Sequence, residues 1–286
     1  MRDLKERLGT LVRLRPSHRE VLEFYAAILK EQIKVQEAVL TEDTLKSSPG
    51  ESPGQRKLPL FEVRDLPLDL AVAKKLFRSL CRVAKGRNQT LQEGIEKIQG
   101  MVRSRKIDMD RFLNEMVLPD SPYVEEISSS HGINRDILCL LGRASIQPSL
   151  ERAAKLLGKG SDLEEWSEGI CPICGSPPLL SELTGQEGRR MLVCSRCEYR
   201  WRGSRMACPF CGTEDHEAHR YLFVEGDEGV RIDVCDNCKK YIKTMDTRET
   251  AQKTFPLLEY VGTLHLDMLA QEKGYHKGSV PFLEIG

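Results

Sequence analysis

Residues 171–175 read Cys-Pro-Ile-Cys-Gly, and residues 208–212 repeat the pattern as Cys-Pro-Phe-Cys-Gly. Each copy is followed by a strand-like stretch and a second Cys-x-x-Cys pair. Two cysteines three positions apart can turn both sulfurs toward one point, and a tetrahedral ion needs two such pairs. The spacing therefore predicts two four-thiolate metal sites. The ligands would be Cys171, Cys174, Cys194 and Cys197 in site 1, and Cys208, Cys211, Cys235 and Cys238 in site 2.

This sequential grouping has one alternative, a cross-braced grouping in which the first pair joins the third and the second joins the fourth. The duplication favours the sequential grouping, because each copy already supplies four ligands. Gly175 and Gly212 follow the first pair of each copy, where the turn around the sulfurs favours a positive φ. Iron and zinc both suit four thiolates, and the sequence does not separate them.

The cysteine-rich half is predicted to alternate knuckles with hairpins, because short β-like runs stand between the cysteine pairs. Gly185 and Gly188 would turn the first hairpin, and Gly226 and Gly229 the second. Each copy then has the plan of a zinc ribbon or rubredoxin. The predicted strands are Leu179–Leu183, Arg190–Val193, Arg220–Val224 and Val230–Val234.

The first half of the chain reads as all-helical, because its apolar residues recur at helical spacing. The Ser/Pro/Gly-rich stretch at about 41–57 predicts a mobile surface loop. Cys81 and Cys139 lie on apolar faces and are expected in the core. Helices are predicted from Pro16 to about Val39, at Leu68–Ala84, Thr90–Arg103 and Asp108–Val117, and from starts at Asn134 and Pro148.

These patterns predict an α+β fold class. An all-helical N-terminal domain at 1–165 is followed by two tandem rubredoxin-like or zinc-ribbon modules, at 166–206 and 207–247. A C-terminal helix and tail occupy 248–286, where an apolar stripe indicates packing back onto a ribbon or the helical domain. The stripe consists of Leu257, Val261, Leu264, Met268 and Leu269.

The composition of the chain limits the classes of partner and the compartment that we expect for it. The chain has 43 basic and 43 acidic residues, so its net charge gives no argument for a nucleic-acid or membrane-surface partner. No apolar run reaches the length of a membrane span, and the first residues lack the apolar core of a signal peptide. We expect a cytoplasmic protein without a membrane partner, in which clustered thiols hold metal rather than form disulfides.

A local basic strip stands out between Arg189 and Arg205, with aromatic residues among the arginines. Such arginines can offset the negative charge of a four-thiolate site, or flank bases stacked on the aromatic rings. The neutral total charge favours the first interpretation. The candidate partner-binding residues are Arg200, Trp201 and Arg202.

No catalytic residue is predicted. Four thiolates close the coordination shell of a metal, whereas a catalytic zinc keeps one position open. The sequence has no glycine-rich phosphate loop, nucleophile elbow or His-Glu-x-x-His motif. His216 and His219 follow Cys211 and are expected to be loop residues rather than ligands. We therefore expect that the chain is not an enzyme.

The cysteine segments resemble the formate dehydrogenase accessory proteins of the FdhE type. The likeness rests on Cys171-Pro-Ile-Cys-Gly-Ser-Pro-Pro178, Cys194-Ser-Arg-Cys-Glu-Tyr-Arg-Trp201, Cys208-Pro-Phe-Cys211 and Cys235-Asp-Asn-Cys-Lys-Lys-Tyr-Ile-Lys243. It extends to Pro281-Phe-Leu283 near the end, and the N-terminal half is similar in layout only.

The resemblance implies a non-enzymatic assembly factor that binds the catalytic subunit of respiratory formate dehydrogenase before export, with rubredoxin-like iron at the eight cysteines. Two other functions stay open: a rubredoxin-like electron carrier and a zinc-ribbon nucleic-acid-binding protein. The client isoform, the contact surface, the role of residues 44–55 and the oligomeric state, a homodimer included, are not fixed by the sequence.

Overall fold

The computed structural model describes residues 1–39, 59–118, 120–159, 161, 163–250 and 252–283. The loop predicted at 41–57 lies outside these residues. Contacts between Cα atoms divide the chain into two compact units. Unit 1 contains Met1–Ala26, Gly50–Glu62 and Leu157–Pro281, and unit 2 contains Ala27–Pro49, Val63–Leu156 and Phe282–Gly286. The four domain segments expected from the sequence stay a prediction.

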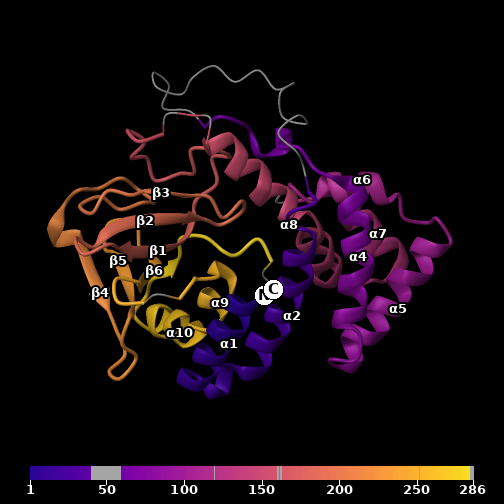
Figure 1. Ribbon diagram of the computed structural model, residues 1–286, viewed down its shortest axis with the longest axis horizontal. Coiled ribbons are helices and arrows are strands. Elements are labelled where there is room, and N and C mark those ends of the chain that lie inside the picture. Colours follow the sequence, from indigo (N-terminus) through magenta and orange to yellow (C-terminus); the bar gives the residue numbers. More distant parts are fainter. Residues whose placement is uncertain (40–58, 119, 160, 162, 251, 284–286) are drawn as a thin grey trace. The chain divides into compact units, whose positions relative to one another are not determined.

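Unit 2 is helical, as the sequence predicts (Figure 1). The predicted helix starts are supported by side-chain caps: Asp108 accepts hydrogen bonds from the amides of Asp110 and Arg111 at 3.0 and 3.1 Å. An additional helix, α7, begins with the capping residue Ser121, whose Oγ accepts from the Val124 amide. The helices are α4 (Leu70–Ala84), α5 (Gln89–Arg103), α6 (Met109–Glu115) and α7 (Pro122–His131), with parts of α2 (Arg19–Val35) and α8 (Arg135–Lys159).

The core of unit 2 forms around α8, which is buried along most of its length. From Ile137 to Leu150 its residues are buried on every face, with the exception of Arg143, so other elements surround this stretch. The rings of Phe77 in α4 and Phe112 in α6 meet edge to face, with centroids 5.8 Å apart. Cys81 and Cys139 are 1% and 5% exposed, which confirms the prediction that they are core residues.

The predicted helix start at Pro148 is wrong, because Pro148 lies inside α8. Proline lacks the N–H that would donate to the carbonyl four residues earlier, here that of Ala144. Instead, Gln32 of α2 donates its side-chain amide to the Ala144 oxygen at 2.8 Å, and Gln32 is 4% exposed. A residue distant in sequence thus satisfies the carbonyl, and the helix continues.

We expect Gln32→Leu to destabilise the protein by about 1–3 kcal/mol, because it leaves the Ala144 carbonyl buried without a donor. Chemical denaturation measures the change. The matched test is Pro148→Ala in the Gln32→Leu background, since alanine restores the backbone donor. If the second substitution recovers no stability, the carbonyl is not the cause of the loss.

Unit 1 is built on one seven-stranded sheet with the order β3-β2-β1-β6-β5-β4, and β7 pairs with β6. The predicted hairpins are present as β1–β2 and β4–β5, whereas β3, β6 and β7 were not anticipated. The strands are β1 (Pro178–Thr184), β2 (Arg189–Cys194), β3 (Arg200–Arg202), β4 (His219–Leu222), β5 (Val230–Cys235), β6 (Lys240–Asp246) and β7 (His276–Lys277).

The two cysteine modules share this sheet. β1 of the first module runs parallel to β6 of the second, from Leu180 opposite Lys243 to Leu183 opposite Asp246. All other neighbours along the sheet order are antiparallel. The fold class is therefore confirmed, and the ladder between β1 and β6 joins the two modules into one mixed sheet.

Two short helices stand where one C-terminal helix was predicted: α9 (Pro256–Val261) and α10 (Leu264–Glu272). They lie beneath one face of the sheet in Figure 1. Leu266 and Ala270 of α10 pack on Ile232 of β5 and Tyr241 of β6. Met268 is 63% exposed, so the predicted stripe is not buried throughout.

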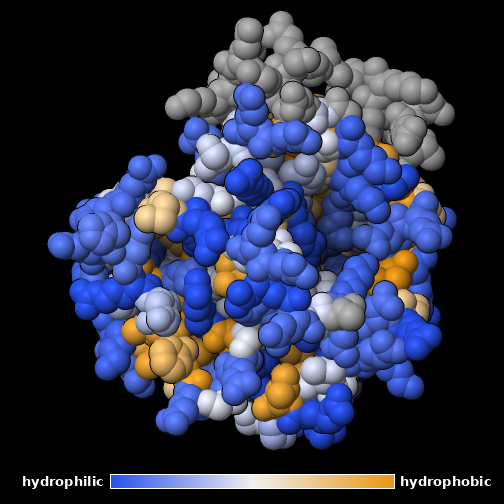
Figure 2. Space-filling model, turned by 60° about the vertical axis from the view of Figure 1, so that its left-hand side comes forward, coloured by the Kyte–Doolittle hydropathy of each residue, from blue (hydrophilic) through white to orange (hydrophobic). Residues whose placement is uncertain are grey.

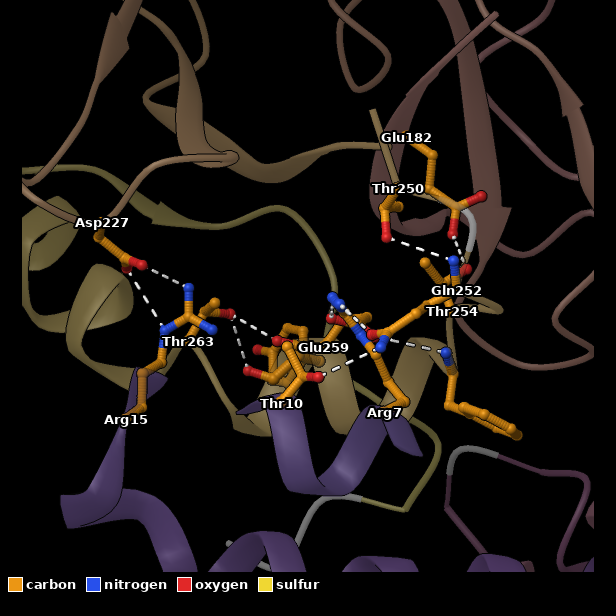
Figure 3. Close-up of polar contacts among 12 residues, drawn as sticks. Arg7, Thr10, Arg15, Glu182, Asp227, Thr250, Gln252, Thr254, Glu259 and Thr263 are labelled. Atoms are coloured by element: carbon orange, nitrogen blue, oxygen red, sulfur yellow. Dashed lines mark hydrogen bonds and ion pairs between the residues drawn. The ribbon is translucent and has the colours of Figure 1, made fainter. Parts of the chain in front are cut away.

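An unanticipated helix, α1 (Arg2–Leu14), also belongs to unit 1. Arg7 forms a bidentate ion pair with the buried carboxylate of Glu259 in α9 (Figure 3). Its Nε lies 2.7 Å from Oε1 and its Nη2 lies 2.5 Å from Oε2. Arg15, directly after α1, pairs with Asp227 of the β4–β5 hairpin at 2.5 Å. The N-terminus is thus fixed by charge pairs rather than by a broad apolar face.

Candidate metal centres

The eight cysteines form two clusters, and the grouping is sequential. Within each cluster the four sulfurs lie within 4.8 Å of one another. In site 1, Cys174 Sγ is 3.5 Å from Cys194 Sγ and 3.6 Å from Cys197 Sγ, and Cys171 Sγ is 3.7 Å from Cys197 Sγ. Site 2 has spacings of 3.8 Å between Cys208 and Cys238 and 3.7 Å between Cys211 and Cys235.

These spacings fit one ion at each centre. Four sulfurs in a tetrahedron about 2.3 Å from a metal lie about 3.8 Å from one another. A disulfide would place two sulfurs about 2.0 Å apart, and the cysteines are free thiols. Both clusters therefore match a four-thiolate shell around zinc or iron, and the geometry does not distinguish the two metals.

The knuckles repeat one backbone design. Gly175 and Gly212 have φ of 70° and 74°, and each donates its amide to the carbonyl of the first cysteine of its pair at 2.9 Å. Glu198 and Lys239 occupy the equivalent positions after the second pairs, with φ of 55° and 57°. The sequence revealed the left-handed position only where a glycine stands there.

Site 1 is enclosed. Its four cysteines are at most 5% exposed. The amides of Leu60 and Phe61 donate to the carbonyls of Pro172 and Ile173 at 2.8 and 2.9 Å, so residues 59–61 lie along the first knuckle. This covering segment was not anticipated, because it lies more than a hundred residues from the knuckle along the chain.

Both tryptophans donate hydrogen bonds to the backbone of residues 168–170, which directly precede site 1. Trp166 Nε1 donates to the Ile170 carbonyl, and Trp201 Nε1 donates to the Glu168 carbonyl, each at 2.9 Å. A buried indole N–H normally finds an acceptor. A tryptophan close to a knuckle in the sequence can therefore indicate a hydrogen bond that holds the adjoining segment.

Site 2 is open on one side. Cys208 and Cys235 are 6% and 3% exposed, but Cys211 is exposed and Cys238 is partly exposed. The exposed Asn237 donates its side-chain amide to Cys211 Sγ at 3.5 Å. The two sites thus share ligand types and spacing but differ in access from solvent.

Thiol acidity differs among the cysteines of each cluster. In the enclosed site 1 the pKa of Cys174 is lowered, because hydrogen bonds from Cys171, Cys194 and Cys197 outweigh its burial. Burial raises the pKa of Cys171 and Cys197 well above the ordinary value and that of Cys208 to about 12. The pKa of Cys211 is lowered to about 7, because hydrogen bonds from Thr213, Asn237 and neighbouring thiols outweigh its slight burial. Metal must displace protons from the raised thiols, so affinity at both sites should fall as pH falls.

We expect a coloured chelator to remove metal in two phases, with site 2 emptied at least about tenfold faster, because site 1 must first open locally. Alkylation of the freed thiols, followed by mass spectrometry, assigns each phase. Early labelling should fall on Cys211 and Cys238. Labelling of Cys171 or Cys174 in the first phase would contradict this order.

The candidate partner-binding residues lie together on β3, but they differ in exposure. Trp201 is 3% exposed and has a packing role. Arg200 donates to the buried carboxylate of Glu182 at 2.9 Å, and Arg202 is exposed. The strip therefore does not present its tryptophan ring for stacking, and partner binding by these residues stays a prediction.

His216 is exposed and His219 is partly buried, and neither belongs to the two metal-ligand clusters found among the described residues. Among all the residues that the structure describes, no helix is both long and apolar enough to cross a bilayer.

Comparison with known proteins places both cysteine segments in one family. Residues 170–205 match the family model described as "FdhE, central domain", and residues 206–283 match "FdhE, C-terminal domain". The two segments contain all eight cysteines.

Similar curated proteins bear the same family name. "Protein FdhE homolog" of Aquifex aeolicus is 32% identical over 150 residues, which is 51% of this chain and 52% of the relative. The homolog of Stutzerimonas stutzeri is 34% identical over 122 residues, or 41% of this chain and 39% of the relative. The chain thus matches about half, or less, of the length of these relatives.

The fold is shared over a greater length. The crystal structure of the FdhE protein from Pseudomonas aeruginosa matches 100% of this chain and 96% of that chain, with a TM-score of 0.68 and 21% identity. This likeness covers the helical half as well as the cysteine-rich half.

Proposed function

Because this chain belongs to the FdhE family, we propose that it is an accessory protein for the maturation and activity of respiratory formate dehydrogenase. It binds the catalytic subunit of that enzyme in the cytoplasm, before export. The observation that carries the proposal is that both family segments are matched and that all eight cysteines group into two clusters within them.

In this function the metals hold a binding surface in shape. The ligands are the eight cysteines, and the ion is iron, as the family resemblance implies, or zinc. Since both ribbons lie in one sheet, loss of either ion would disturb strands that the other module also uses. Four thiolates leave no open position at the metal, which supports a role other than enzymatic catalysis.

The test is an affinity pull-down from formate-metabolising cells with the intact protein and with Cys171→Ser/Cys174→Ser. Recovery of the catalytic subunit by the intact protein only is the expected result. Cys81→Ser is the control, because Cys81 is a buried thiol outside the clusters. Absence of the catalytic subunit from the intact sample would contradict the proposal.

A second function, electron transfer, is favoured by the exposure of Cys211 at site 2. With iron bound, an exposed ligand sulfur shortens the path to a redox partner. A reversible visible spectrum on reduction and reoxidation would support this function, and a protein that binds only zinc would exclude it, since zinc has no redox chemistry.

A further inference from the structure

Two cavities lie on the face of the sheet that is opposite α10. Ile232 and Val234 of β5 pack toward α10, so the alternating residues Arg231 and Asp233 face the other side. A cavity of about 160 Å³ is lined by Arg231, Asp233 and Tyr221, and a second, of about 420 Å³, is also lined by Tyr221 and Arg231. Because they share two lining residues, the cavities are adjacent, and together they are here called the β4 groove. It runs from site 2 to the β4–β5 hairpin.

The end of the groove beside site 2 is basic. Asp233 is the carboxylate in its lining, and Asp236, just outside, pairs with Arg220. A divalent ion with four thiolates adds about two negative charges nearby. The cationic side chains outnumber these charges, so this end attracts an anionic group. They are Arg190, Arg205, Arg220, Arg231 and Lys240.

Two polar side chains at this end, those of Arg205 and His219, are placed to contact a ligand. The side chain of Arg205 is exposed, and it donates a hydrogen bond to the Glu187 carbonyl at 3.1 Å. His219 also lines the cavity, and its Nε2 is buried with no hydrogen-bond partner among the described residues. A buried polar atom without a partner is costly, and a ligand could satisfy it.

The hairpin end of the groove exposes apolar side chains among acidic ones, which include Glu225 and Glu228. Tyr221 and Phe223 are 61% and 63% exposed, with ring centroids 6.3 Å apart, and Val224 is 38% exposed. Figure 2 brings the β4 side forward and shows orange, hydrophobic atoms among blue ones. Exposed aromatic residues that lie together are typical of protein interfaces.

β4 is also the last strand of the sheet order, and among the described residues no strand pairs with its outer side. Sheet edges are normally protected by charged residues, proline or a covering segment, because their free backbone groups pair with other chains. An edge with two exposed aromatic residues is suited to receive an extended segment.

We propose that the β4 groove binds an extended segment of a client protein, which pairs with the outer edge of β4 and carries an acidic and an apolar side chain two positions apart. Residues two apart in a strand point to the same face. The acidic side chain enters the basic end, and the apolar one packs on Tyr221 and Phe223. Backbone pairing supplies affinity and the two side chains supply specificity. The identity of the client rests on the proposed function.

The test uses the full chain with its metals and the purified, cofactor-free catalytic subunit of formate dehydrogenase. Arg205→Glu and Phe223→Ser each change one exposed side chain of the groove, so folding and metal content should be unchanged. Each should weaken binding at least about tenfold. The matched controls are Arg13→Glu on α1 and Met268→Ser on α10, the latter replacing a side chain that is also 63% exposed; both should bind as the unaltered protein does.

A peptide array that tiles the catalytic subunit then locates the segment. Peptides that bind should contain the acidic and apolar pair and should fail to bind Arg205→Glu. If the unaltered protein binds the subunit but the groove variants bind equally well, the groove is wrong and the proposed function stands. If the unaltered protein does not bind the subunit, or retains only nucleic acid, both proposals are overturned.

Discussion

Cys171→Ser/Cys174→Ser is expected to reduce the metal content from two ions to one per chain and to destabilise unit 1 severely. Site 1 is enclosed, so the remaining cysteines would stay buried without the ion that binds their sulfurs. Metal binding contributes about 10–16 kcal/mol to folding in small zinc peptides. Even a fraction of that contribution would lower the melting temperature by more than about 10 °C.

The matched comparison is Cys208→Ser/Cys211→Ser, which should also remove one ion but should lower the melting temperature less, because site 2 already borders solvent. Elemental analysis gives the metal content of both variants, and thermal unfolding gives their melting temperatures. Two ions retained in the site 1 variant, or unchanged unfolding, would contradict a structural role for that centre.

Asp267→Ala is expected to destabilise the protein by about 3–5 kcal/mol, because it leaves a buried ammonium without its carboxylate. Lys243 of β6 is 1% exposed, and its Nζ lies 2.9 Å from Asp267 Oδ2 of α10. The same Nζ donates to the Tyr260 carbonyl at 2.9 Å and lies 3.6 Å from the centre of that ring. This pair fixes α10 to the sheet, so its loss should lower the melting temperature by about 10 °C.

A triple variant separates the cost of the unpaired Lys243 charge from the loss of side-chain packing at position 267. Asp267 also accepts from Tyr241 Oη at 2.8 Å, so Lys243→Met/Asp267→Leu/Tyr241→Phe removes every polar group of the pair at once. Replacing a buried ion pair with apolar residues is often neutral. We expect recovery of more than half of the lost stability. A loss below about 0.5 kcal/mol for Asp267→Ala alone would show that the lysine finds another partner.

The cysteine spacing predicted both four-cysteine clusters because a knuckle is a local structure: its two cysteines and its left-handed residue lie within five positions. The same locality made the hairpins β1–β2 and β4–β5 readable. Strand β6 was missed because Lys243 and Asp246 interrupt its apolar pattern. Lys243 can be buried because the Asp267 carboxylate and the Tyr260 carbonyl, both distant in sequence, accept its hydrogen bonds.

Other omissions have the same origin. Helix α1 buries Leu4 and Leu11 and depends on Arg7 finding Glu259 across most of the chain. The parallel pairing of β1 with β6 carries no local signature. The difference in exposure between the two sites also depends on distant residues, since residues 59–61 lie along the knuckle of site 1. Contacts of this kind are decided by the tertiary fold and not by spacing or propensity.

The decisive measurement for the two four-thiolate centres is the metal content of the purified chain together with X-ray absorption at the metal edge. We expect two ions per chain, each with four sulfur neighbours at about 2.3 Å and no nitrogen or oxygen ligand. One ion per chain, a mixed ligand shell, or cysteines oxidised to disulfides would contradict this expectation.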